Sequence, residues 1–120
     1  MGKGRMKILV VEDDLEHLAA LGEGLTGLGA EVVLASSGRE AIERVASFAP
    51  DAALVDVMLP DMSGITLANV LRGLAGEGLR VVAFSGADPG KIRDAVGRSL
   101  FDDYVAKPAP LISIALALRC

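Results

Sequence analysis

Five short apolar runs alternate with longer amphipathic segments along this chain of 120 residues, and this alternation constrains the fold more than any other feature. The runs are rich in Val, Ile and Leu and have the length of β-strands. They cover residues 7–11, 31–35, 52–56, 80–84 and 104–106. Strands that alternate with helices at this spacing form a parallel sheet with helices on both faces. The sequence therefore predicts one doubly wound α/β domain over residues 1–120, with 1–6 as a disordered leader.

The segments between the runs carry the spacing and the end signals of helices. The first has one apolar stripe that Gly29 would terminate; the stripe is formed by Leu18, Leu21, Leu25 and Leu28. The second opens with a capping box formed by Ser37 and Glu40. Its predicted buried face, before Pro50, is Ala41, Ile42, Val45 and Ala49. Further helices are predicted over 64–74, from Asp88 onward, and after 107–110.

Glycines inside the first predicted helix raise two questions. Gly22 and Gly24 each disfavour a helix by about 1 kcal/mol relative to Ala, and the sequence offers no reason for them. They also belong to "GEGLTG" (22–27), which fits the dinucleotide-binding pattern G-x-G-x-x-G. That pattern works only in the turn after the first strand, where the backbone can approach a pyrophosphate. Because these glycines fall well inside the helix, we reject a nucleotide site there.

Composition excludes several classes of protein. The net charge of −4 argues against a nucleic-acid-binding surface in this chain. Cys120 is the single cysteine, so the sequence predicts neither a disulfide framework nor a zinc motif, and favours a reducing, cytoplasmic location. No apolar stretch has the roughly 18 residues of a membrane span. We therefore expect a protein that binds neither nucleic acid nor membrane.

Polar residues follow the predicted strands at one edge of the sheet. Asp56 ends a strand that is otherwise a continuous apolar run, although an aspartate there could simply mark the strand end. The ends of the other strands add Glu12, Asp13, Asp14, Ser85 and Lys107. In open parallel sheets ligands bind in the crevice at the carboxyl ends of the strands. Acids, a hydroxyl and an amine at one rim therefore predict a functional site.

The chain resembles the receiver domain of two-component response regulators from Lys7 to its end. The matching segments are "ILVVEDD", "LVDVMLPDMSG", "VVAFSG" and "DDYVAKP", in the same order and spacing. The resemblance implies a flavodoxin-like sheet order, 2-1-3-4-5, and a phosphoacceptor rather than an enzyme. By matching position Asp56 is the phosphorylated aspartate, and the phosphoryl donor is a histidine kinase or a phosphotransfer protein.

The resemblance also assigns the remaining site residues. Mg²⁺, or Mn²⁺, would be bound by the carboxylates of Asp13 and Asp56, by the Met58 backbone carbonyl and, through water, by Glu12. These are the oxygen ligands that Mg²⁺ prefers. The residues that would bind the phosphoryl group and relay the switch are Ser85, Lys107 and Tyr104. Two apolar residues flanking the site would set the phosphoryl lifetime because they cannot orient an attacking water; these are Met58 and Ala87.

Some positions depart from the family pattern. Glu12 and Ser85 replace the commoner Asp and Thr, and Gly86 stands where Ala is usual. Leu100 and Phe101 replace a Gly-Ala pair, which removes an easy left-handed cap for the fourth helix. We therefore expect that helix to be short, shifted or mobile. His17, the only histidine, is interpreted as an ordinary helix residue, although its proximity to the acid cluster leaves a tuning role open.

Two alternatives and one surface stay open at this stage. A degenerate receiver could bind partners without phosphorylation, and a flavodoxin-like enzyme could bind a nucleotide or flavin. The chain holds no effector domain, so it is either a stand-alone regulator or part of a longer protein.

In the last helix Ile112 and Leu116 fall on the outer side, while Leu111, Ile114, Ala115 and Leu118 face the sheet. We expect the outer pair to dock a partner or a second copy, unless a longer helix covers it.

Overall fold

The computed structural model describes residues 4–76, 78–86, 90, 94 and 100–120. Its strands are β1 (Lys7–Val11), β2 (Glu31–Ala35), β3 (Ala52–Asp56), β4 (Arg80–Ser85) and β5 (Asp103–Ala106). Its helices are α1 (Leu15–Gly27), α2 (Gly38–Phe48), α3 (Gly64–Ala75) and α5 (Leu111–Leu118). All five predicted strands are confirmed, with β4 and β5 each one residue longer than predicted. The helix predicted from Asp88 falls mostly outside the described residues.

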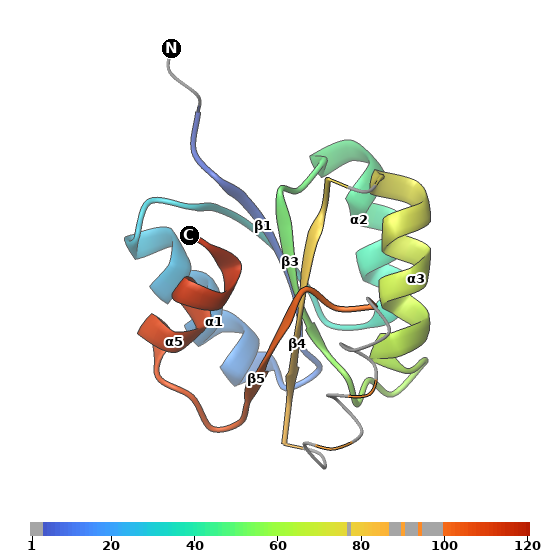
Figure 1. The fold of residues 1–120 in the computed structure, drawn as a ribbon. Coiled ribbons are helices and arrows are strands. Elements are labelled where there is room, and N and C mark those ends of the chain that lie inside the picture. Colours follow the sequence, from blue (N-terminus) through green and yellow to red (C-terminus); the bar gives the residue numbers. More distant parts are fainter. Residues whose placement is uncertain (1–3, 77, 87–89, 91–93, 95–99) are drawn as a thin grey trace.

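The strands form one parallel sheet in the order β2-β1-β3-β4-β5. Helices α1 and α5 cover one face of this sheet, and α2 and α3 cover the other (Figure 1). The predicted doubly wound, flavodoxin-like order is therefore confirmed. Because β1 and β3 lie at the centre of the sheet, the segments that follow them emerge side by side at its carboxyl edge.

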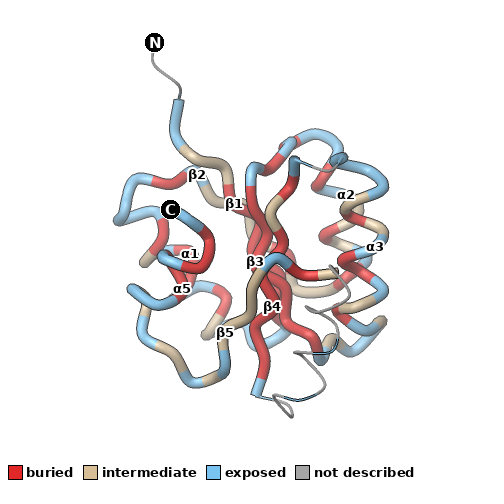
Figure 2. Tube along the Cα trace, in the orientation of Figure 1, coloured by how far each residue is buried: buried red, intermediate tan, exposed pale blue. Residues whose placement is uncertain are grey.

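The central strands are buried on both faces (Figure 2). Every residue of β3 is buried, whereas the edge strands β2 and β5 are mostly half-buried. Alternate residues of the central strands enter two separate cores. The core under α2 and α3 takes Leu9, Val11, Ala53 and Val55; the core under α1 and α5 takes Ile8, Val10, Ala52 and Leu54. This double burial explains why these strands are continuous apolar runs.

Close packing explains the glycines of α1. A Cβ atom on Gly22 would lie 3.0 Å from Leu34 Cδ2 on β2, and one on Gly24 would lie 2.9 Å from Leu111 Cδ2 on α5. Both glycines therefore let α1 pack directly against the ends of these two leucine side chains, which would have to shift to make room for a Cβ atom. The stripe prediction was wrong at Leu28, which is 51% exposed. The helix already ends at Gly27, and Leu28 is the cap residue before Gly29, whose φ is +99°.

Helix α2 begins as predicted but ends differently. The Ser37 side chain accepts a hydrogen bond from the Glu40 N–H at 3.1 Å, while the Glu40 carboxylate accepts one from the Ser36 N–H at 2.7 Å. The reciprocal bond of the capping box is thus displaced by one residue. The prediction that Ala49 is buried was wrong, because Ala49 adopts a left-handed cap with φ 52° and points away from the core. Phe48 occupies the buried position instead.

The segment entering β5 is anchored to α3. Phe101, which departs from the family pattern, is 2% exposed and lies in the core under α2 and α3. Arg72 donates to the Leu100 carbonyl at 3.2 Å and to the Asp102 carboxylate at 2.8 Å. Burial raises the pKa of Asp102, but hydrogen bonds from the Val81 N–H and from Arg72 outweigh it and hold that pKa below its ordinary value.

Candidate functional site

The polar residues of the predicted rim lie where the strands end. Glu12 and Asp13 follow β1, Asp56 is the last residue of β3, and Lys107 follows β5. The turn after β1 is held by Asp14, whose carboxylate accepts hydrogen bonds from the backbone N–H groups of the first turn of α1, as an N-cap does. Topology thus brings together side chains that lie up to 95 residues apart in the sequence.

Lys107 joins the two buried carboxylates of the rim. Its ammonium nitrogen lies 2.6 Å from Glu12 Oε1 and 3.0 Å from Asp56 Oδ2. Glu12 is 1% exposed and Asp56 3% exposed, so each needs such a partner. Burial alone would lower the pKa of Lys107, but its hydrogen bonds to Glu12 and Asp56 raise that pKa above 10.5. The side chain is therefore an ammonium at neutral pH.

The loop after β3 fixes the orientation of Asp56. Its Oδ1 accepts a hydrogen bond from the Met58 N–H at 2.8 Å. The Gly64 N–H donates to the Val57 carbonyl at 2.9 Å, which ties the start of α3 to the end of β3. A Cβ atom on Gly64 would lie 2.6 Å from Val57 Cα and 2.7 Å from the Asp56 carbonyl oxygen. Only glycine therefore fits at the end of the D-x-x-x-P-x-x-x-G pattern.

Three carboxylates of the rim are close enough to bind one cation. Each of Glu12, Asp13 and Asp56 offers an oxygen within 4.8 Å of the other two. Asp13 is exposed, which leaves the cluster open to solvent. Carboxylate oxygens suit Mg²⁺ or Mn²⁺. Because the single Lys107 ammonium offsets only one of these three negative charges, the cluster fits a divalent cation.

The other predicted site residues lie at or near the rim. Ser85, the last residue of β4, is 4% exposed, and its carbonyl accepts a hydrogen bond from the Lys107 N–H at 2.9 Å. Tyr104 on β5 is half-buried and packs against the core under α2 and α3. The side chain of Met58 is 68% exposed. Ala87 lies outside the described residues.

His17 makes a contact that the sequence did not predict, although its proximity to the acid cluster had left a tuning role open. Its Nδ1 lies 3.2 Å from Glu12 Oε1, and its ring centroid lies 5.4 Å from that of Phe84. The sequence signal was its place in the first turn of the helix that follows the acidic pair. An apolar stripe does not show which polar side chain of that turn reaches back to the strand end.

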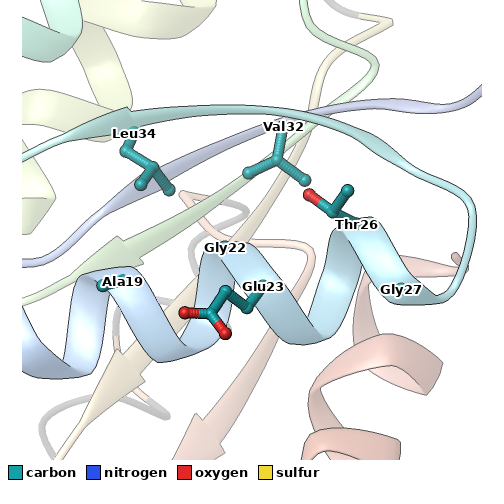
Figure 3. Close-up of a pocket in the computed structure, with 7 residues that line it drawn as sticks. All are labelled: Ala19, Gly22, Glu23, Thr26, Gly27, Val32 and Leu34. Carbon is teal, nitrogen blue, oxygen red and sulfur yellow. The ribbon is translucent and has the colours of Figure 1, made fainter.

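An open groove of about 620 Å³ lies between α1 and β2 (Figure 3), and its lining includes none of the three rim carboxylates Glu12, Asp13 and Asp56. It is lined by Ala19, Gly22, Glu23, Thr26, Gly27, Val32 and Leu34. The glycines of the G-x-G-x-x-G pattern thus lie within and along α1, away from its N-terminus. This placement agrees with the rejection of a nucleotide-binding turn at these glycines.

In the described part of the chain, no helix combines the length and the apolar character needed to cross a membrane.

Comparisons with known proteins agree with this geometry. A family model described as the response regulator receiver domain matches residues 8–119. The response regulator MprA of Mycolicibacterium vanbaalenii is 35% identical over 114 residues, which are 95% of this chain and 49% of that protein. The chain therefore spans about half the length of the curated relatives that it matches.

Solved structures show the same fold. A CheY-like response regulator receiver domain protein from Methanospirillum hungatei superposes with a TM-score of 0.89 at 24% identity, over 97% of this chain and 92% of that one. A response regulator from Burkholderia pseudomallei was solved with a phosphorylated aspartic acid, a calcium ion and citrate. It superposes with a TM-score of 0.85 at 30% identity, over 94% of this chain and 66% of that one.

Proposed function

The chain belongs to the response regulator receiver domain family of two-component systems, and we propose that it is a phosphoacceptor switch. In this switch Asp56 takes a phosphoryl group from a histidine kinase or a phosphotransfer protein. The observation that carries this proposal is the environment of Asp56. A carboxylate that is 3% exposed lies at a strand end, with the Lys107 ammonium 3.0 Å away and two further carboxylates within 4.8 Å. A buried structural aspartate needs one cationic partner, but it does not need two further carboxylates beside it.

The chain's residues favour phosphoryl transfer by position and charge. A carboxylate oxygen of Asp56 would attack the phosphorus of a phosphohistidine, so that the nitrogen–phosphorus bond breaks and an acyl phosphate forms. Such reactions depend mainly on positioning and on neutralising the phosphoryl oxygens. The Met58 N–H holds the Asp56 carboxylate in one orientation, and the Lys107 ammonium lies beside it to pair with a phosphoryl oxygen. The hydroxyl of the buried Ser85, at the end of β4, would bind a second phosphoryl oxygen.

A divalent cation, Mg²⁺ or Mn²⁺, would supply further charge neutralisation. It would be held by Asp13 and Asp56, by the Met58 carbonyl, and by Glu12 through water. Asp13→Ala should lose Mg²⁺ binding at millimolar metal, because it removes a direct carboxylate from a site that relies on few protein ligands. Glu16→Ala, a neighbouring acid outside the cluster, is the control. Unchanged Mg²⁺ titrations for Asp13→Ala would refute the ligand assignment.

The switch would begin at Ser85 and Tyr104. When Ser85 is drawn toward the phosphoryl group it leaves space, and the half-buried Tyr104 ring on β5 can turn inward. This is a two-state element biased by a local charge. The neighbouring outer face of α5 carries Ile112 and Leu116, which are 61% and 70% exposed. We propose that this face docks a second copy or a partner, and that phosphorylation strengthens the contact.

Incubation with a small phosphodonor tests the proposal directly. With acetyl phosphate and saturating Mg²⁺, the intact mass of the wild-type protein should increase by one phosphoryl group, and that of Asp56→Asn should not. The substitution keeps the size of the side chain and removes the nucleophilic carboxylate. A wild-type protein that takes up no phosphoryl group would instead indicate the alternative, a degenerate receiver that binds partners without phosphorylation.

A further inference from the structure

The loop of residues 57–63, between β3 and α3, carries the Met58 backbone beside Asp56. The Met58 N–H donates a hydrogen bond to Asp56 Oδ1 at 2.8 Å. Across the loop, Met58 pairs with Ser63 in an isolated antiparallel bridge. These contacts fix the two ends of the loop, so the position of Met58 also depends on what holds the loop tip, residues 59–62.

Asp61 anchors this loop tip to a different element, the first turn of α2. Its Oδ1 accepts a hydrogen bond from the Gly38 N–H at 3.0 Å, and its Oδ2 accepts one from the Arg39 N–H at 2.9 Å. The hydrogen bonds from Arg39 and Gly38 hold the pKa of Asp61 below its ordinary value, so the carboxylate is ionised at neutral pH. The next residue, Met62, packs on Gly38, where a Cβ atom would lie 2.6 Å from Met62 Cγ. A residue from outside α2 therefore supplies the acceptors that two N–H groups of a helix start require.

The start of α2 is also tied to the other side of the carboxylate cluster. The Glu12 N–H donates to the carbonyl of Ala35, the last residue of β2, at 3.1 Å. Helix α2 begins shortly afterwards, at Gly38. Asp61 therefore links the loop that follows Asp56 to the segment that is hydrogen-bonded to Glu12.

We propose that Asp61 is a positioning residue, which holds the loop tip on α2 and so keeps Met58 and Asp56 in the arrangement that phosphorylation requires. Without its two hydrogen bonds the loop tip could move away from α2, and the Met58 N–H that orients Asp56 Oδ1 would move with it. Phosphoryl transfer depends mainly on positioning, so a less fixed acceptor should react more slowly. The inference rests on the proposed function in this last step, whereas the anchoring of the loop can be tested without it.

Two variants and a matched control separate the anchoring from charge and from helix stability. Asp61→Ala removes both acceptors, whereas Asp61→Asn keeps one acceptor oxygen and has the same net charge as the alanine variant. Ser37→Ala removes another cap of the same helix turn, the hydrogen bond that the Ser37 side chain accepts from the Glu40 N–H at 3.1 Å, in a residue outside the loop. If Asp61 only capped α2, Asp61→Ala and Ser37→Ala would behave alike.

Amide hydrogen exchange measured by NMR tests the anchoring in the metal-free protein, without phosphorylation. The Met58 amide should exchange about 3- to 10-fold faster in Asp61→Ala than in wild type, as expected for the loss of hydrogen bonds to an exposed carboxylate. The increase should be smaller in Asp61→Asn, and Ser37→Ala should stay within about twofold of wild type. An unchanged Met58 exchange rate in Asp61→Ala, or an equal increase in Ser37→Ala, would overturn the proposal.

Phosphorylation by acetyl phosphate at saturating Mg²⁺ then tests the consequence for the site. The rate constant should fall by about 3- to 10-fold in Asp61→Ala and stay within about twofold of wild type in Ser37→Ala. A wild-type rate in Asp61→Ala would contradict the positioning role. A wild type that takes up no phosphoryl group would count against the proposed function, while the exchange rate of the Met58 amide would still decide whether Asp61 anchors the loop.

Discussion

Gly64→Ala should destabilise the protein, whereas Gly73→Ala in the same helix should stabilise it. At Gly64 the new Cβ would lie 2.6 Å from Val57 Cα and 2.7 Å from the Asp56 carbonyl oxygen, both backbone atoms that cannot rotate away. Carbon atoms normally stay about 3.5–4.0 Å apart, so α3 or the end of β3 must move by roughly 1 Å. Overpacking of this kind costs about 1–3 kcal/mol of unfolding free energy.

Gly73 is the matched control. It is exposed on α3, and a Cβ there would meet no atom within 4 Å. Alanine at such a helical position should stabilise by about 0.5–1 kcal/mol, through helix propensity and a less flexible unfolded chain. For a domain of this size 1 kcal/mol corresponds to roughly 4 °C in Tm. We therefore expect Tm to fall by about 4–12 °C for Gly64→Ala and to rise by about 2–4 °C for Gly73→Ala.

Thermal unfolding followed by circular dichroism measures both variants under the same metal-free conditions. A Gly64→Ala protein that melts at or above the wild-type temperature would refute the reasoning, because the contact with the backbone would then be relieved at no cost. The same variant should also take up phosphoryl groups more slowly than Gly73→Ala, since the atoms that must move include the backbone of the proposed acceptor, Asp56.

Three further predictions concern pH, phosphoryl lifetime and association. The lowered pKa of Asp102 stabilises the fold above pH 3.8, and this contribution is lost as pH falls through the folded-state pKa. The Tm difference between wild type and Asp102→Asn should therefore be smaller at about pH 3 than at pH 7. An unchanged Tm difference would contradict the stabilising role of the Arg72–Asp102 pair. Met58→Asn should speed the loss of the phosphoryl group, because an amide can orient an attacking water near Asp56. Intact mass over time measures this loss, and equal decay rates for wild type and Met58→Asn would show that residue 58 does not set the phosphoryl lifetime. Phosphodonor should increase self-association of the wild type in sedimentation experiments but not that of Ile112→Glu/Leu116→Glu, and a wild type that stays monomeric throughout would end the self-association claim.

Much of the fold follows from local patterns in the sequence. The strand at 52–56 is apolar up to its last residue because both faces of a central parallel strand are covered. The order of strands and helices restricts the topology to a doubly wound sheet, and such a sheet brings the ends of β1, β3, β4 and β5 to one edge. For this reason the sequence alone placed Glu12, Asp13, Asp56 and Lys107 at a common rim, and the structure brings them together there.

Other features depend on how closely the elements approach one another, which no local pattern records. The sequence could not account for Gly22 and Gly24, because their reason is the distance from α1 to Leu34 on β2 and to Leu111 on α5. It misplaced Leu28 and Ala49, because periodicity does not show where a helix stops and its chain turns away from the core.

The contact between His17 and Glu12 depends in the same way on the tertiary structure. Its geometry follows from the packing of the imidazole on Phe84, a residue of β4 that lies 67 positions further along the chain. The sequence by itself determined which chemical groups reach the rim, because strand order and residue type are written along the chain. The tertiary structure decided which of them touch, because hydrogen bonds form or fail over a few tenths of an ångström, and only the packed helices and strands set those distances.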